Sequence, residues 1–201
     1  MNKKLKTLVI SGAAVSLGAS SLLVPAAYAV SQTANTVINA NIGVTVSIST
    51  SGTVNLAITP TSGGSATSAS DTVSVSTNDS AGYTLELSSS SAQVTLTNGG
   101  NSIAASSGTQ TSPVTLANNT WGYRVDGVGG FGSGPTSAQT NQASLSGTWA
   151  GIPASGSPNT LKTTATTASG DTTTVWYGAK ADTTKPNGTY TDTVTYTATG
   201  N

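Results

Sequence analysis

The chain of 201 residues contains no cysteine and no histidine, and it has a single glutamate, Glu86. Without histidine or cysteine it lacks the groups for a Ser-His-Asp or Cys-His catalytic arrangement, and for zinc, haem or iron–sulfur sites with their usual ligands. Its acidic residues are spread singly along the sequence, with no pair spaced like the dyad of a glycosidase. We therefore predict that the protein is not an enzyme and has no cofactor, no catalytic residue and no metal site.

The first 29 residues have the pattern of a secretory signal peptide. Three lysines precede an apolar stretch from Leu8 to Leu23, and small residues at Ala27 and Ala29 fit the usual cleavage rule. Cleavage there would leave a mature chain of 172 residues that begins at Val30. The apolar stretch is interrupted by serine and glycine and is short for a membrane span of about 20 residues. We expect a secreted protein, extracellular or cell-surface associated, that is not an integral membrane protein after cleavage.

Charged side chains are scarce, at 7% of the chain. The mature part keeps four cationic and seven acidic residues, a net charge of −3. Binding to a nucleic-acid backbone needs clustered lysine and arginine, so nucleic acid is not an expected partner. A chain of this length buries about 70% of its unfolded surface, so it does not need disulfides to fold.

Alternation of apolar with small or polar residues dominates the mature chain, as is typical of half-buried β-strands. Serine and threonine supply 67 of the 201 residues, and no segment shows the period of an amphipathic helix. The clearest strand is expected at 42–49, where four aliphatic side chains would share one face: Ile42, Val44, Val46 and Ile48. Further strands are expected at 54–58, 73–75, 83–87, 94–96, 121–125, 173–179 and 190–199.

Turn clusters rich in glycine, asparagine and proline separate these segments. Eight or more short strands with one apolar face each bury that face when two sheets pack together. We predict an all-β fold, an antiparallel β-sandwich of the Ig-like or jelly-roll-like kind, as a single domain over 30–201. The expected core consists of Val44, Val46, Ile48, Leu56, Ile58, Val73, Val75, Leu85, Leu87, Val175 and Val194.

The segment 126–160 interrupts the strand pattern with clustered glycines and prolines. Excursions of this length are uncommon in compact domains and are often functional. Three apolar residues within it, Leu145, Trp149 and Ile152, are expected to anchor it to the sandwich.

Three segments carry a resemblance to known surface proteins. They are Ala-Gly-Tyr-Thr-Leu-Glu-Leu at 81–87, Trp-Gly-Tyr-Arg-Val at 121–125, and the ending from Pro186 to Thr197. Their order spans nearly the whole mature chain and is similar to uncharacterised secreted β-sandwich surface proteins of small-genome, host-attached bacteria, a group with no assigned activity. The resemblance implies a sandwich fold and a place at the cell surface.

Two further families share parts of this pattern. WxL surface domains, which associate noncovalently with the Gram-positive wall, have Gly-Trp-x-Leu early and Trp-x-Leu at the end. Here Tyr83 and Tyr196 stand where those tryptophans would be. The Gly-Thr-Tyr-Thr-Asp-Thr-Val ending at 188–194 also resembles spore coat protein U-type pilins, which normally carry cysteines and polymerise by donating a strand to a neighbour.

The first functional hypothesis is a structural or adhesive surface protein, a subunit of a fibre or surface layer. The candidate donor is the mature N-terminus, 30–49. Its alternating Ile42, Val44, Val46 and Ile48 are the candidate assembly strand, which would fill a groove on a neighbouring copy while main-chain hydrogen bonds supply affinity. The alternative is that this strand pairs within its own sandwich. Lysines and prolines, which normally protect sheet edges, are few, which favours assembly through strands.

The second hypothesis is a noncovalent module that binds cell-wall glycan or other carbohydrate by stacking exposed aromatic rings on sugars. Trp176 and Tyr177 are adjacent in an expected strand, so they should point to opposite sides, and one of them should reach a surface. The alternative is that aromatic residues anchor the core. The candidate stacking residues are Trp121, Tyr123, Trp149, Trp176 and Tyr177.

Two minor hypotheses concern individual side chains. Scattered aspartates and loop carbonyls suit calcium, although no EF-hand or nonapeptide pattern is present. Lys180 and Glu86 have the residue types of a lysine–asparagine crosslink promoted by a neighbouring acid, but a solvated lysine and a strand-face glutamate are the favoured interpretation.

Overall fold

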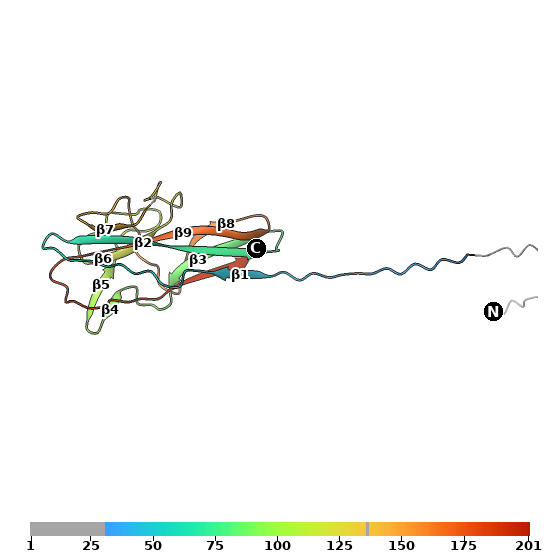
Figure 1. Ribbon diagram of the computed structural model, residues 1–201, viewed down its shortest axis with the longest axis horizontal. Helices are drawn as coiled ribbons and strands as arrows, with labels where there is room; N and C mark the ends of the chain where they lie inside the picture. The colour runs from blue at the N-terminus through green and yellow to red at the C-terminus, as the bar shows by residue number, and fades with distance from the viewer. Residues whose placement is uncertain (1–30, 136) are drawn as a thin grey trace, which may run out of the picture. The chain divides into compact units, whose positions relative to one another are not determined.

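The computed structural model describes residues 31–135 and 137–201. The predicted signal peptide, 1–29, lies outside the described residues. The chain divides into two units, one up to Asn41 and one from Ile42 to Asn201. In the first unit, residues 31–41 are exposed and form no strand. The second unit carries every strand shown in Figure 1.

The described part of the second unit contains ten strands and no helix, so none of its elements is a helix that could cross a membrane. The strands are β1 (Val46–Ser49), β2 (Ser65–Thr77), β3 (Tyr83–Ser89), β4 (Leu96–Asn98), β5 (Asn101–Ala105), β6 (Thr120–Arg124), β7 (Gln139–Gln142), β8 (Asn159–Thr163), β9 (Ala168–Ala181) and β10 (Val194–Gly200).

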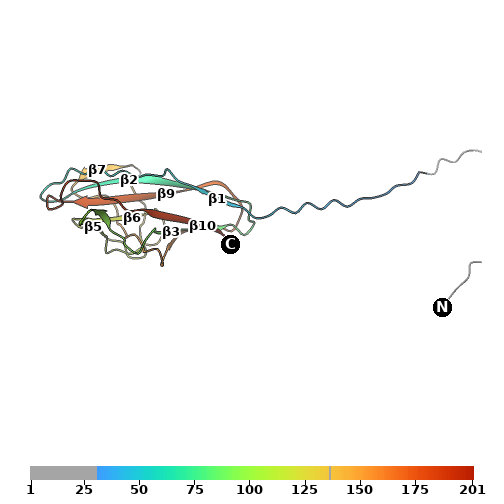
Figure 2. The same ribbon diagram turned by 90° about the horizontal axis from the view of Figure 1, so that it is seen from below.

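The strands form two sheets, which confirms the all-β, sandwich-like prediction. The larger sheet has the order β1-β2-β9-β6-β5-β4, with β7 also paired to β2, and the smaller has the order β10-β3-β8. Long β2 and β9 run side by side, as both views show (Figures 1 and 2). One pair, β5 with β6, is parallel and departs from the expected antiparallel pattern. Segment 106–119 supplies the long crossover that a parallel pair requires.

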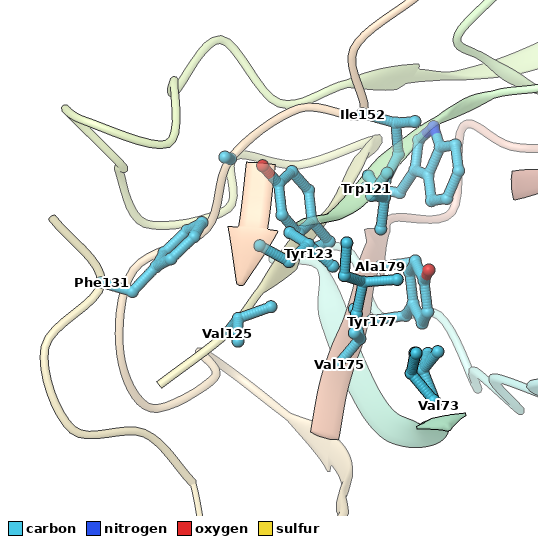
Figure 3. Packing of buried hydrophobic residues seen from close by; sticks show 14 of the residues in the cluster. Val73, Trp121, Tyr123, Val125, Phe131, Ile152, Val175, Tyr177 and Ala179 are labelled. Atoms are coloured by element: carbon cyan, nitrogen blue, oxygen red, sulfur yellow. The ribbon is translucent and has the colours of Figure 1, made fainter. Parts of the chain in front are cut away.

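The main core lies between the sheets and contains more aromatic residues than expected (Figure 3). Tyr83, Tyr123 and Tyr177 are buried in it together with Trp121. Of the predicted core residues, Val73, Val75, Leu85, Leu87 and Val175 are fully buried, and Val46, Leu56, Ile58 and Val194 are half-buried against them.

Val44 and Ile48 were wrongly assigned to the core, because they are 64% and 40% exposed. β1 pairs with β2 only from Val46 opposite Thr77 to Ser49 opposite Ser74. β2 ends at Thr77. Beyond it, the Asn78 side chain bonds the residues that precede β1, accepting from Thr45 N at 2.7 Å and donating to the Gly43 carbonyl at 2.9 Å. Residues 42–44 therefore have no partner strand within the described chain.

A second, smaller core covers the outer face of the larger sheet. It contains Ala66, Leu116, Leu145, Trp149 and Trp176. Glycines at the paired positions Gly122 and Gly178 leave a hollow in the sheet for the segment around Trp149. A Cβ on Gly178 would lie 2.9 Å from the Trp149 ring, so a larger residue there would exclude the indole.

These contacts anchor the excursion, of which the structure describes 126–135 and 137–160. It contains β7 and the first residues of β8, and its three predicted anchors, Leu145, Trp149 and Ile152, are all buried. Backbone hydrogen bonds between Trp149 and Val114 and between Ala150 and Tyr123 fasten it to the sandwich. The excursion therefore packs on the outer face of the larger sheet.

Arg124 fixes the start of the excursion from inside the protein. Its side chain is completely buried, and its guanidinium donates to the Phe131 carbonyl at 3.0 Å and contacts Asp126 Oδ1 at 3.2 Å. The guanidinium carbon lies 6.0 Å from the centre of the Phe131 ring. The sequence did not predict that Arg124 is a buried hydrogen-bond donor, because arginine is normally exposed.

Candidate functional site: a groove and an exposed arm

The segment 52–60, which we call the strap, follows β1 without forming a strand. Its apolar residues Val54, Leu56 and Ile58 alternate with exposed neighbours and are half-buried against the main core. The predicted period of two is therefore present, but the predicted strand at 54–58 is not. The edge of β2 that faces away from β9 pairs with β1 at 74–77 and with β7 at Ala66 and Ser68, and the strap forms no backbone ladder with the residues between them.

Side-chain hydrogen bonds hold the strap in place instead of a backbone ladder. Thr67 Oγ1 donates to the Ala57 carbonyl at 2.8 Å, and Thr59 N donates to Asn141 Oδ1 at 2.7 Å. Just before the strap, Ser51 N donates to Asp71 Oδ1 at 2.9 Å. The strap is thus an extended segment whose backbone groups are largely unpaired within the described chain.

A groove of about 1150 Å³ opens beside the strap. The strap and the segment 185–196 line it, and so do buried side chains of the larger sheet, among them Trp121, Tyr177 and Ala179. Small-molecule pockets are typically about 300–1,000 Å³. The size of the groove and its lining by two long segments therefore suit an extended chain better than a compact ligand.

One side of the groove is bounded by an unpaired sheet edge. β10 is the outer strand of the smaller sheet and pairs only with β3. Val194 and Tyr196 of β10 line the groove, whereas Thr195 between them is exposed and does not line it. The edge therefore offers unpaired backbone groups and inward-facing apolar side chains together.

Two tyrosines join the sheets across the groove. The hydroxyl groups of Tyr177 on β9 and Tyr196 on β10 lie 2.7 Å apart. Burial raises the pKa of both phenols, and the neighbouring Asp71 carboxylate raises that of Tyr196 further. At neutral pH both phenols are protonated, so one can donate a hydrogen bond to the other.

Two more tyrosines are held in polar clusters outside the groove. The Tyr83 hydroxyl donates to Asp171 at 2.8 Å, while Lys162 contacts the same carboxylate at 2.6 Å. The hydrogen bond from Lys162 lowers the pKa of Asp171, and burial together with Asp171 raises the pKa of Tyr83. Burial raises the pKa of Tyr123 to about 12.

These four tyrosines predict steep alkaline unfolding. A phenol whose folded pKa is raised stabilises the protein fully below the unfolded pKa, about 10, and this contribution is lost as pH rises toward the folded pKa. Above about pH 11, each such tyrosine should lower the free energy of unfolding by about 1.4 kcal/mol per pH unit. Urea denaturation at several pH values, with absorbance at 295 nm to follow phenolate, checks this. Independent ionisation of all tyrosines near pH 10 in the folded protein would contradict it.

The exposed apolar side chains are concentrated at the start of the described chain. We call residues 37–45 the arm. Val37, Ile38, Ile42 and Val44 are between 64% and 87% exposed. Apart from Ile48 and Val114, no other large apolar side chain of residues 31–135 and 137–201 is exposed. Ile38, Ala40, Ile42 and Val44 alternate in the sequence, so pairing of the arm as a β-strand would place them on one face.

The candidate assembly strand is therefore divided by the structure. Val46 and Ile48 belong to β1 and pair with their own β2, as the alternative interpretation expects. Ile42 and Val44 belong to the arm and have no strand partner in the described chain. The predicted donor segment 30–49 includes Ile38 and Ala40, but its predicted apolar face began only at Ile42, although these two residues continue the same period of two.

The candidate glycan-stacking residues are all interior. Trp121, Tyr123, Trp149, Trp176 and Tyr177 are each no more than 7% exposed. The expectation that either Trp176 or Tyr177 reaches a surface needs correction, because both faces of β9 are covered. Tyr177 faces the main core, and Trp176 packs in the second core with Trp149. None of these rings offers a face to a sugar.

The remaining candidates are not brought together. Lys180 lies on β9 in the larger sheet and Glu86 on β3 in the smaller one. Among the described residues, no group of three or more acidic side chains is placed to hold a metal ion. A comparison with known proteins finds no family model, no curated protein and no solved structure that matches this chain.

Proposed function

We propose that this chain is an exported structural or adhesive subunit of the cell surface, with an Ig-like or jelly-roll-like sandwich, that assembles with copies of itself by β-strand addition. The observation that carries the proposal is the arm, an alternating apolar face without a partner strand. Soluble proteins rarely expose contiguous apolar surface that has no binding role. Strand addition uses this pattern, because alternate side chains enter pockets while the backbone completes a sheet.

The energetics of the arm are sufficient for reversible assembly. Burial of one aliphatic side chain contributes about 1.5–3 kcal/mol, so Ile38, Ile42 and Val44 together contribute about 5–9 kcal/mol. Association costs about 4–15 kcal/mol of lost freedom, and backbone hydrogen bonds along the added strand offset part of it. Assembly should therefore depend on concentration and be sensitive to single changes in the arm.

Substitution of arm residues by aspartate tests the proposal. Ile38→Asp and Ile42→Asp place a charge on the apolar face, where burial would desolvate it, so each should raise the concentration for half-assembly at least 30-fold, about 2 kcal/mol. Neither should change the melting temperature, because both side chains are exposed. Light scattering after size-exclusion chromatography of the mature chain measures the effect.

The matched controls add the same charge at the opposite parity. Asn39→Asp and Asn41→Asp lie in the same segment but off the apolar face, and they should assemble like the unchanged chain. A mature chain that stays monomeric at high concentration, or an equal effect of all four substitutions, would overturn self-assembly through the arm. Cell fractionation and antibody labelling of intact cells test the surface location separately.

A further inference from the structure

We infer that the arm of one copy docks in the groove of a second copy, as an added strand along the free edge of β10. This inference rests on the proposed function and names its acceptor. The groove lies between the strap and the segment 185–196, and the inserted arm would lie beside Val194 and Tyr196. Its apolar face would contact the groove residues of the larger sheet, and its backbone would pair with β10.

The strap shows what kind of segment the groove accommodates. Its Val54, Leu56 and Ile58 rest on the main core with aliphatic residues at every second position. The arm repeats this arrangement with Ile38, Ala40, Ile42 and Val44. Both segments are extended runs of aliphatic and small residues without charge, so the surface that receives one is chemically suited to the other.

The smaller sheet provides the backbone complement. It has three strands against seven in the larger sheet, and the β10 edge beside the groove has no strand partner in the part of the chain that the structure describes. Addition of the arm would extend the order to arm-β10-β3-β8 and cover apolar surface of the larger sheet. The charges permit this approach, since the described arm residues 37–45 carry none.

The contact would join two different surfaces, an arm and a groove. Such a heterologous contact leaves one unused arm and one unused groove at the ends of every assembly, so it produces chains unless the geometry closes a ring. The expected product is therefore a filament whose length increases with concentration.

Disulfide trapping tests the acceptor directly, because the chain has no cysteine of its own. In an inserted arm, Asn39 and Asn41 would face outward beside Thr195 and Thr197, which are exposed residues of β10 that do not line the groove. Cross-strand neighbours on one face have Cβ atoms about 4.5–5.5 Å apart, within reach of a disulfide. Full-length mature chains carrying Asn39→Cys or Asn41→Cys are mixed with tagged chains carrying Thr195→Cys or Thr197→Cys and oxidised. At least one combination should give fivefold more mixed dimer than either arm variant gives with Ser144→Cys.

Ser144 is a matched control because it is exposed, lies in the 126–160 excursion and does not line the groove. If the unchanged chain assembles through its arm but all combinations trap no better than the Ser144 control, the groove is not the acceptor, and the proposed function stands. If a chain with both Asn41→Cys and Thr195→Cys closes only on itself, the second copy is excluded as occupant. If the unchanged mature chain is monomeric, both proposals fail.

Discussion

Replacement of Trp149 by alanine should lower the free energy of unfolding by about 3–5 kcal/mol. The indole is completely buried in the second core, against Leu116, Leu145 and Trp176. It fits over Gly178, whose missing side chain makes the hollow that holds it. Neighbouring strands cannot move in to fill the space, because β9 is paired on both sides. Urea denaturation followed by circular dichroism measures the loss.

Val114→Ala is a suitable comparison for this variant. Val114 forms the backbone bridge to Trp149, but its own side chain is 40% exposed. Its truncation should cost less than about 1 kcal/mol, since little apolar area is removed from the core. If Trp149→Ala folded with unchanged stability and lost binding to cell-wall fragments, the ring would be a glycan contact, contrary to its burial.

Replacement of Arg124 by leucine should destabilise the protein by about 3 kcal/mol. The substitution removes the buried donors that serve the Phe131 carbonyl at 3.0 Å and the Thr148 carbonyl at 3.4 Å. These two carbonyls lie in the first and second halves of the excursion, and one guanidinium donates to both. Amide hydrogen exchange should show the loss of protection concentrated in 126–150, with β3 and β10 little affected.

Two further substitutions separate the hydrogen bonds of Arg124 from its charge. Asp126 is 43% exposed whereas Arg124 is buried, so Asp126→Asn keeps an acceptor oxygen but leaves the guanidinium without its counter-charge, and it should cost about 1–3 kcal/mol. Arg124→Lys keeps the charge but cannot serve two separated carbonyls with one ammonium group, so it should recover less than half of the loss. Equal stability of Arg124→Leu and the unchanged protein would show that the excursion is held by its apolar anchors alone.

The alternating pattern predicted strands correctly where the segment pairs with neighbouring strands and its inward face packs against a second sheet. The expected strands at 73–75 and 83–87 are real and belong to β2 and β3, because their inward residues meet a second sheet. The same alternation at 42–44 and 54–58 did not produce strands. At 42–44 the neighbouring β2 has ended, and at 54–58 side-chain hydrogen bonds with Thr67 and Asn141 hold the segment in place of a backbone ladder.

The site was only partly predictable for the same reason. The aliphatic face of Ile42 and Val44 was recognised because it depends on neighbours in sequence. The groove was not, because Trp121, Tyr177 and Tyr196 come from three strands distant in the chain. The prediction that an aromatic ring is exposed was wrong for a related reason. Alternation shows that Trp176 and Tyr177 point to opposite faces of β9, but it does not show that another segment covers each face.

The sequence alone determined that successive side chains of an extended segment point to opposite sides, and the alternating pattern without helix periodicity indicated an all-β fold. Only the tertiary structure decided which strands pair and which faces are covered, because both depend on free strand edges and on segments distant in sequence. For this reason Trp149 is a core residue, Arg124 is a buried hydrogen-bond donor to the excursion, and the arm has no strand partner in the described chain.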